Sequence, residues 1–294
     1  MLFRPTAACY KNLKASSKTW VARQFRDPYV KKRLSDPAAY RSRSAFKLLE
    51  IDAEWDHFLQ KPDVRAVVDL GAAPGGWSQV VAGKLGWGAE ASKLPSGGYA
   101  YGVKSELEME KKGTWSSPKS VSHQEVFDPL NIDALKEFTP SAGRGTIVAV
   151  DLLRMQPIHG VHAIQADFLS PEAADRIHEL LSVKGNLEGK ADIILSDMAG
   201  NASGNDTHDI ESSLEICEAV YEFARRNLRS AEDVGRRRGG VLLMKHFEHP
   251  LLQKFRMEKL QPNFNDVKYI KPEASRSASR EGYFLCQGWR AIDI

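Results

Sequence analysis

The feature that most constrains the fold is a repeated alternation between short apolar runs and longer segments with helical periodicity. Short runs rich in Val, Ile and Leu are typical of strands that are buried on both faces. Strands that alternate with helices predict an α/β fold, with a mostly parallel sheet covered by helices on both faces. The predicted strands are Ala66–Leu70, Thr146–Asp151, Val161–Ile164, Asp192–Ser196, Gly240–Met244, Asp266–Ile270 and Tyr283–Gln287. The predicted helices are Tyr40–Trp55, Trp77–Lys84, Pro171–Leu181, Leu214–Leu228 and Pro250–Leu260.

The 294 residues suffice for one large α/β domain with appendages. The segment before Asp27 contains no acidic residue, whereas six basic residues are spaced among Ser, Thr and Ala. This composition is typical of a mitochondrial transit peptide, and a basic arm that contacts RNA is the alternative. We therefore expect residues 1–26 to be a transit peptide or basic arm and residues 27–294 to form a single domain, located in the mitochondrial matrix.

Residues 85–145 interrupt the alternation, since they contain Gly-Gly, Ser-Ser-Pro and several lysines but little strand periodicity. We expect an insertion there. No run approaches the roughly 18 consecutive apolar residues that a bilayer span requires, so no membrane span is expected. The cysteines Cys9, Cys217 and Cys286 are far apart and form no CxxC, which excludes a disulfide framework and a zinc knuckle. The sequence requires no metal.

The segment from Val67 to Ser78, VVDLGAAPGGWS, predicts a strand, a loop of small residues and a helix. Glycines let a ligand approach the backbone, and a helix N-terminus offers free N–H groups. In an open α/β sheet such a loop lies at the carboxyl edge of the strands, where ligands bind. The loop lacks the GK[ST] ending of a P-loop, and Ala72 and Pro74 break the G-x-G-x-x-G spacing. A nucleoside triphosphate site and a Rossmann dehydrogenase are therefore disfavoured.

Acidic residues stand at or just after the ends of three predicted strands. Asp69 ends the first run, Asp151 ends the second, and Asp167 follows the third. A carboxylate at such a strand end can accept hydrogen bonds from ribose hydroxyls. One such residue is commonly only a cap, whereas three of them at one sheet edge predict a pocket for an adenosine-type ligand.

Several blocks, in order, resemble the FtsJ/RrmJ family of RNA ribose 2′-O-methyltransferases, particularly members that act on large-subunit rRNA in bacteria and mitochondria. The blocks are YRSRSAFKLLEID, DLGAAPGGWSQ, VDLLRM, QADF, LSDMAGN, GGVLLMKHF and KPEASRSASREGYFLC. The resemblance extends from about Trp20 to Trp289, apart from the insertion. It implies a Rossmann-like methyltransferase fold, a seven-stranded sheet with an antiparallel last strand, and S-adenosyl-L-methionine as cofactor. The cofactor-binding residues it implies are Asp69, Gly71, Pro74, Gly75, Gly76, Trp77, Asp151, Asp167 and Asp197.

Methyl transfer to a ribose needs a base, because a 2′-hydroxyl is a poor nucleophile until its proton is removed. A lysine can serve when burial or a neighbouring cation lowers its pKa. The resemblance implies a tetrad of Lys47, Asp197, Lys245 and Glu281. We expect Lys245 to be the base, Lys47 to tune it and contact substrate, Asp197 to orient the lysine and touch the cofactor, and Glu281 to anchor the network.

Basic residues are concentrated in the segments that flank the proposed tetrad. Cations there would contact phosphates, a sequence-independent interaction that positions RNA. The alternative is a solvated helix face together with a flexible KPEASRSASR loop. The expected RNA-binding residues are Lys31, Lys32, Arg33, Arg41, Arg43, Arg276 and Arg280, joined by Lys271.

The leading hypothesis is therefore S-adenosylmethionine-dependent 2′-O-methylation of a ribose, a uridine, in mitochondrial large-subunit rRNA, which supports ribosome biogenesis. The expected partner is that rRNA or a pre-ribosomal particle. Two alternatives stay open. One is 2′-O-methylation of a tRNA or an mRNA cap, and the other is a catalytically idle RNA-binding factor in ribosome assembly.

Overall fold

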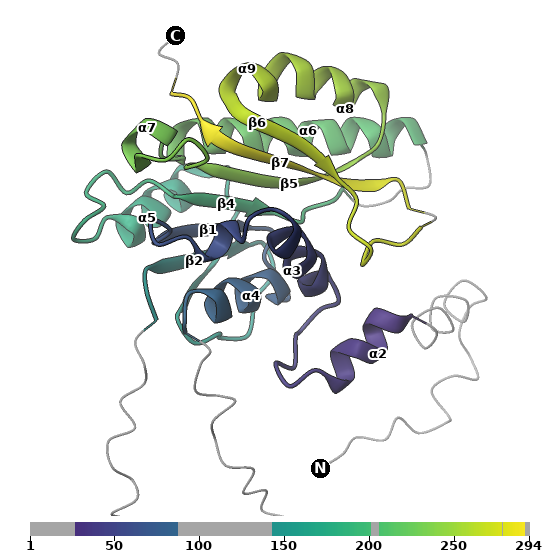
Figure 1. Ribbon diagram of the computed structural model, residues 1–294, viewed down its shortest axis with the longest axis horizontal. Helices are drawn as coiled ribbons and strands as arrows, with labels where there is room; N and C mark the ends of the chain where they lie inside the picture. The colour runs from purple at the N-terminus through teal and green to yellow at the C-terminus, as the bar shows by residue number, and fades with distance from the viewer. Residues whose placement is uncertain (1–26, 88–142, 201–205, 278, 292–294) are drawn as a thin grey trace, which may run out of the picture.

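A seven-stranded sheet with helices on both faces forms the framework of the computed structural model (Figure 1). The structure describes residues 27–87, 143–200, 206–277 and 279–291. The predicted leader, residues 1–26, lies outside the described residues, as do residues 88–142 of the predicted insertion. Among the described helices, none is long and apolar enough to cross a membrane.

The strand order in the sheet is β3-β2-β1-β4-β5-β7-β6. Strands β1 to β5 pair in parallel, and β7 runs antiparallel to both of its neighbours. This confirms the predicted mostly parallel sheet with an antiparallel last strand. The strands are β1 (Ala66–Leu70), β2 (Thr146–Asp151), β3 (Val161–Gln165), β4 (Ile193–Ser196), β5 (Val241–Phe247), β6 (Phe264–Ile270) and β7 (Glu281–Trp289).

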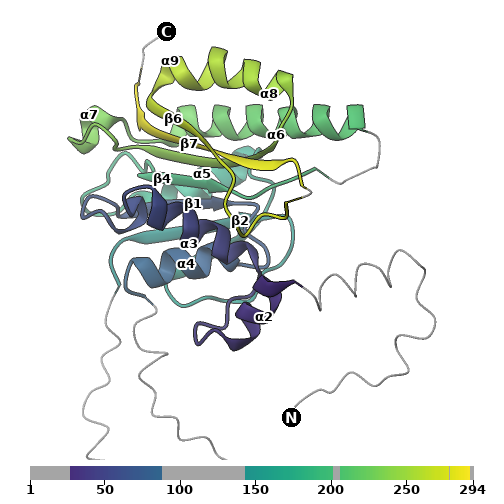
Figure 2. The same cartoon turned by 45° about the vertical axis from the view of Figure 1, so that its right-hand side comes forward.

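Helices cover the two faces of the sheet as separate layers, which Figure 2 shows nearly edge-on. One layer contains α5 (Pro171–Leu181), α6 (Asp206–Asn227) and α8 (Pro250–Phe255), and the other contains α3 (Ser44–Glu54) and α4 (Gly76–Lys84). Shorter elements complete the fold: α2 (Pro28–Ser35), the 3₁₀ turn Phe58–Gln60, α7 (Ala231–Val234), a π-helical turn Arg256–Leu260 and α9 (Gln261–Asn263).

The central strands are apolar on both faces because both faces are covered. In β1, Val68 and Leu70 pack in the cluster beneath α5 and α6, whereas Val67 packs in the cluster beneath α3 and α4. All five residues of this strand are buried. The continuous apolar run that predicted the strand is therefore a consequence of its position inside a three-layer fold.

Several predicted boundaries are wrong, among them the start of α3, the start of β6 and both ends of β7. Strand β5 continues past Met244 to Phe247, because the antiparallel partner β7 pairs with Lys245 and Phe247. Helix α6 begins at Asp206 rather than at Leu214. The segment predicted as one helix over Pro250–Leu260 changes to a π-helical turn after Phe255. The extension of β5 matters for the site, since it places Lys245 within a paired strand instead of in a loop.

Candidate active site

The loop between β1 and α4 is bonded to the end of β2. The N–H groups of Gly71 and Ala72 both donate to the Val150 carbonyl, at 2.8 and 3.2 Å. Gly71 has a φ of 70°, and a Cβ there would lie 2.0 Å from Cγ of Met198. A side chain at this position would therefore be strained and would clash with the segment after β4.

The same loop ends in two glycines where α4 begins. Gly75 precedes the helix with a φ of 107°. At Gly76 a Cβ would lie 2.0 Å from Oγ of Ser42, so the helix start packs directly on the segment before α3. Pro74 is exposed at the outer side of the loop. The loop is thus exposed at Pro74 and tightly packed where α4 begins.

Trp77 occupies the interface between α4 and α3. Its side chain is 2% exposed, and its Nε1 donates to the Ser44 carbonyl at 2.9 Å. The ring lies 5.8 Å from the ring of Tyr283, centroid to centroid. Trp77 was predicted to bind the cofactor, but its side chain lies in the core, where it packs α4 against α3.

The predicted acidic residues have different surroundings. Asp151 accepts hydrogen bonds from the N–H groups of Ala73 and Leu153, at 2.9 and 2.7 Å, so it holds the glycine loop against the end of β2. Asp167 is exposed after β3, and its side chain accepts from the Leu169 N–H at 3.0 Å. Asp69 is buried within β1 and accepts from the Ser78 hydroxyl at 2.6 Å.

Burial raises the pKa of Asp69 to about 7. The hydrogen bond from Ser78 opposes this rise, whereas the negative charges of Asp197 and Asp151 add to it. Asp151 and Asp197 therefore lie close enough to Asp69 to act on it electrostatically at the carboxyl edge of the sheet. A positively charged ligand at this edge would be stabilised by these carboxylates, and by Asp69 once it ionises.

These carboxylates fit S-adenosylmethionine, which carries a positive sulfonium and two ribose hydroxyls that can donate hydrogen bonds. Asp151 would hold the ribose, and the acidic edge would face the sulfonium. An open pocket of about 390 Å³ begins at Ala72 and Asp151 and continues past Met155 to Ile164 and Gln165. In the part of the chain that the structure describes, no group of three or more His, Cys, Asp or Glu side chains could hold a metal ion.

Arg41 connects the glycine loop to the segment after β2. Its guanidinium donates to the carbonyls of Pro74 at 3.3 Å and Pro157 at 2.6 Å, and also to that of Gln156. Its backbone N–H donates to the side-chain oxygen of Gln79 in α4. The sequence predicted an RNA contact for this arginine, and the structure places its side chain on these carbonyls.

The four tetrad residues form two ion pairs. Lys47, from α3, lies 2.7 Å from Glu281 at the start of β7, measured from Nζ to Oε1. Lys245, from β5, lies 3.1 Å from Oδ1 of Asp197, the residue that follows β4. Its Nζ also donates to the Asp197 backbone carbonyl at 2.6 Å. The topology explains the grouping, because β4 and β5 are parallel neighbours and β7 pairs with β5.

Tyr283 joins the two pairs, and the sequence prediction did not include it. Its hydroxyl donates to Oδ1 of Asp197 at 2.7 Å, and Nζ of Lys47 lies 5.7 Å from its ring centroid. Burial raises the pKa of Tyr283 well above its ordinary value, and the charge of Asp197 adds to this, so the phenol stays a hydrogen-bond donor. The signal that identifies Tyr283 is its position opposite Lys245, which requires the pairing of β5 and β7 to be known.

Glu281 is held in its charged form by its neighbours. Burial alone would raise its pKa, but the charge and hydrogen bond of Lys47, a hydrogen bond from the Ser275 hydroxyl and the charge of Lys245 together lower it. The Ser275 bond to Oε1 is 2.7 Å long. Both lysines therefore act on one carboxylate, which brings the two ion pairs into a single network.

The predicted RNA-binding residues divide into two groups. Lys31, Lys32, Arg276 and Arg280 are exposed. Arg33 donates to the Arg41 carbonyl at 2.7 Å, and Arg43 pairs with Asp27 and donates to the Ala274 carbonyl. Arg276 also lies 3.6 Å from Asp27, which caps α2. Asp27 therefore pairs with two of the predicted RNA-binding residues, Arg43 and Arg276, and these contacts connect α2 to the segment before β7.

Comparison with known proteins agrees with this geometry. A model of FtsJ-like methyltransferases matches residues 40–289. A Rhodopseudomonas palustris (strain HaA2) protein named ribosomal RNA large subunit methyltransferase E is 34% identical over 287 residues, which cover 98% of this chain and 91% of that protein. A Coxiella burnetii (strain RSA 331) protein of the same name is 34% identical over 269 residues, covering 92% and 93%.

A solved structure shares the fold. A Plasmodium falciparum chain described as a ribosomal RNA methyltransferase superposes with a TM-score of 0.55 at 22% identity, covering 85% of this chain and 98% of that one. The family match includes the glycine loop and all four tetrad residues. The chain belongs to the FtsJ-like methyltransferase family.

Proposed function

We propose that this chain transfers a methyl group from S-adenosyl-L-methionine to the 2′-hydroxyl of a uridine ribose in mitochondrial large-subunit rRNA, and so supports ribosome biogenesis. The names of the bacterial relatives support an rRNA substrate. The composition of residues 1–26, which are basic and free of acidic side chains, supports import into the mitochondrial matrix. The substrate would be the rRNA itself or a pre-ribosomal particle.

The observation that carries the chemistry is the pair of hydrogen bonds from Lys245 to Asp197. A neutral lysine amine has two N–H groups and one lone pair. In the structure Nζ donates to both the carbonyl and the carboxylate of Asp197, which uses two N–H groups. The remaining lone pair of the neutral amine would accept the proton of the 2′-hydroxyl, so Lys245 would be the general base.

The cofactor would supply a methyl group carried on a positively charged sulfur, and the 2′-oxygen would attack the methyl carbon as its bond to that sulfur breaks. The residues that would hold it are the glycine loop, with Asp151 on the ribose and Asp197 near the sulfonium. Because Asp197 also orients Lys245, a single carboxylate would fix the base relative to the methyl group. Such fixed orientation lowers the barrier by removing the entropy of alignment.

Lys47 and Glu281 would hold the acceptor side of the site. Lys47 is 8% exposed and lies between Glu281 and the ring of Tyr283, so its position is set by packing. Its charge would favour the neutral form of a nearby lysine and stabilise the oxygen that loses its proton. Glu281 would anchor Lys47, as its contact at 2.7 Å indicates.

A methyl-transfer assay tests the proposal. The purified protein is incubated with labelled S-adenosylmethionine and, separately, with mitochondrial large-subunit rRNA, its pre-ribosomal particle, tRNA and capped mRNA, and methylated riboses are then mapped. We expect one 2′-O-methyluridine in the large-subunit rRNA or its particle. Transfer to tRNA or to the cap would replace the proposed substrate. Cofactor and rRNA binding without any transfer would support an assembly factor instead of an enzyme.

A further inference from the structure

A second pocket of about 390 Å³ lies on the opposite face of the sheet from the tetrad. Successive residues of a strand point to opposite faces, so His246 faces away from the side of Lys245. The neighbouring Leu242 and Met244 pack in the cluster with α6 and α8, which is the face that His246 shares. The pocket is bounded by His246 of β5, Tyr269 of β6, Phe284 of β7 and the π-helical turn that follows α8.

The pocket contains buried polar atoms without partners. His246 is 3% exposed, and among the described residues neither ring nitrogen has a partner with good hydrogen-bond geometry, although the Phe247 backbone is near enough to oppose the fall of its pKa. Nε of Arg256 in the same wall also lacks a partner. Buried polar groups are nearly always hydrogen-bonded, and an unsatisfied one costs about 1–3 kcal/mol. Three such atoms around one cavity indicate a ligand that supplies the missing bonds.

The neutral imidazole offers one donor and one acceptor. Burial lowers the pKa of His246 to about 4, so the ring is uncharged at neutral pH. Arg256 adds a donor. The missing partner is therefore a group with both donors and acceptors on one edge, rather than an anion that only accepts.

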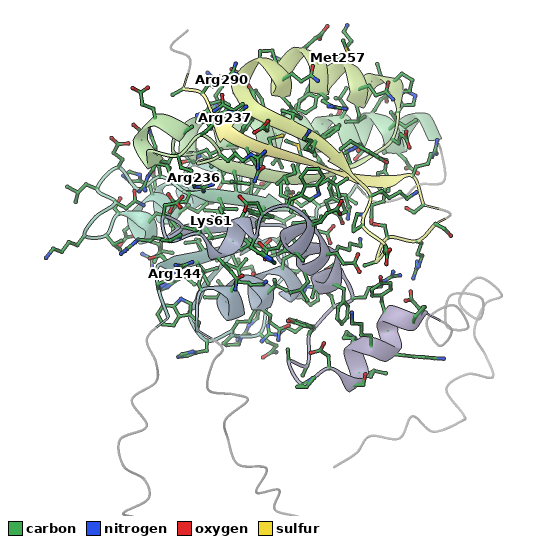
Figure 3. All side chains as sticks on the ribbon, in the orientation of Figure 1. Lys61, Arg144, Arg236, Arg237, Met257 and Arg290 are labelled. Atoms are coloured by element: carbon green, nitrogen blue, oxygen red, sulfur yellow. The ribbon has the colours of Figure 1, made fainter. Side chains whose placement is uncertain are left out.

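Aromatic rings and a methionine form one part of the remaining wall, and polar side chains form the rest: Glu248, His249, Gln253 and Gln261. The His246 ring stacks on Phe284, with centroids 3.7 Å apart and planes within 10°, and the Tyr269 ring lies 5.5 Å away. Tyr269 is 38% exposed and Met257 is 64% exposed. Figure 3 shows Met257 on the helical segment above the sheet. An unbranched thioether can move to admit a ring, and π-helical turns such as the one carrying Met257 often occur at functional sites.

The pocket shares a lining residue with a cavity near the tetrad edge. Glu248 borders it and also borders a smaller cavity of about 200 Å³. That cavity is lined by Gly200, which lies three residues after Asp197, and by Arg280, which precedes Glu281. A single strand that crosses this edge could therefore place one nucleotide at Lys245 and a neighbouring base in the pocket.

We propose that this pocket binds a nucleobase of the substrate RNA, from a nucleotide close to the methylated one. The inference rests on the proposed function, since it takes RNA as the substrate. A nucleobase is flat, carries donors and acceptors on its edges and stacks on aromatic rings. RNA is commonly recognised through unpaired bases that are splayed out onto such rings. The pocket volume lies within the range of about 300–1,000 Å³ typical of ligand sites.

His246→Phe tests the pocket, because phenylalanine keeps the stacking on Phe284 and removes both nitrogens. The probe is a single-stranded fragment of large-subunit rRNA that contains 4-thiouridine beside the methylated position. We expect kcat/KM for this RNA to fall about tenfold, the loss of one good hydrogen bond, with the Kd for S-adenosylmethionine unchanged.

The melting temperature of His246→Phe should equal or exceed that of wild type, since the substitution removes two unsatisfied atoms. Photocrosslinking should attach wild-type protein to the RNA at Met257 or Tyr269.

Two further variants keep the test decisive. Tyr269→Leu, at the rim, should also lower kcat/KM for the RNA and should answer the question if His246→Phe does not fold. Leu251→Ala is the matched control, because Leu251 is 43% exposed on α8 and does not line the pocket. It should methylate the RNA at the wild-type rate.

Wild-type kcat/KM in both pocket variants, together with crosslinks elsewhere, would overturn the proposal. Crosslinking to free 4-thiouridine monophosphate but not to the RNA fragment would also overturn it, in favour of a site for a free nucleotide. If the wild-type protein methylated no RNA, the proposed function would fail on its own. The crosslinking of bound RNA would still decide whether the pocket takes a base.

Discussion

The hydroxyl of Tyr283 donates a hydrogen bond to Oδ1 of Asp197 at 2.7 Å, the same oxygen that lies 3.1 Å from Nζ of Lys245. The carboxylate is thus held from two sides, by a neighbouring parallel strand and by the antiparallel strand β7. Because Asp197 orients Lys245, the position of the candidate base also depends on the hydroxyl of Tyr283, a residue that lies opposite Lys245 in the strand register.

Tyr283→Phe should lower the rate of methyl transfer. The ring remains packed against Trp77, but Asp197 loses a donor to its charge, and such bonds contribute about 1.5–3 kcal/mol. A tenfold to hundredfold fall in the single-turnover rate is expected, with little change in RNA affinity. Tyr221→Phe is the matched control, since Tyr221 is buried among Phe255 and Trp289 away from the site. Equal rates for both variants would show that the hydroxyl of Tyr283 has no role in orientation.

Glu281→Gln should destabilise the protein in a pH-dependent way. The folded state lowers the pKa of Glu281 below its ordinary value of 4.5. The stability from this shift is fully present above about pH 4.5 and is lost as the pH falls through the lower folded pKa. Urea unfolding should therefore show wild type more stable than the variant at pH 7, with a difference that shrinks towards pH 3. A constant difference across that range would contradict the ion pair as its source.

Asp69→Asn should remove a pH dependence of folding stability that is opposite in sign to the one from Glu281. The folded protein raises the pKa of Asp69 from 3.8 to about 7, so between these values the folded state binds more protons than the unfolded chain. Stability from this group falls as the pH rises from about 4 to 7. The positively charged cofactor should bind more tightly as Asp69 ionises, which predicts a lower Kd at pH 8 than at pH 6. Isothermal titration at both values checks this. In the Asn variant the Kd for the cofactor should change less between pH 6 and pH 8. If the Kd changed as much as in wild type, Asp69 would not be the group responsible.

Arg41→Ala should weaken cofactor binding more than it slows the chemical step. The guanidinium holds Pro74 of the glycine loop to the carbonyls after β2, and its removal leaves three acceptors without their donor. We expect the Kd for S-adenosylmethionine to rise about tenfold, with a smaller change in the rate at saturation. Arg41→Lys should not restore binding, because an ammonium lacks the fork that reaches carbonyls on both sides. Arg176→Ala, on the exposed surface of α5, is the control. Full rescue of the Kd by Lys would show that a positive charge at this position, rather than the guanidinium fork, is sufficient to hold the loop.

The sequence predicted those parts of the fold that follow from local patterns. Strands such as Ala66–Leu70 and Thr146–Asp151 have the predicted bounds, because buried parallel strands are mostly apolar. Helix α6 was predicted too short, since its first turns are polar and lack apolar periodicity. The end of β5 was missed because Lys245 and His246 are polar, and only pairing with the distant β7 makes them strand residues.

The candidate site could be predicted only as a set of separate positions. The resemblance gave Lys47, Asp197, Lys245 and Glu281, and the structure brings them together in two ion pairs. Tyr283 could not be found in this way, because its role depends on the strand register that places it opposite Lys245, a residue distant in the chain. The three carbonyls that hold Arg41 are likewise distant from it in sequence. Without these contacts, the sequence shows only a basic residue near the tetrad, which predicts a phosphate contact.

The most direct test of the central claim is the single-turnover rate of ribose methylation by Lys245→Ala, measured with large-subunit rRNA at saturating S-adenosylmethionine. Loss of a general base typically slows a reaction by about 10²–10⁴-fold. We expect a loss of at least about a hundredfold, with cofactor and RNA affinities close to those of wild type. A rate within a few-fold of wild type would show that Lys245 does not take the proton, and would contradict the mechanism built on its two hydrogen bonds to Asp197.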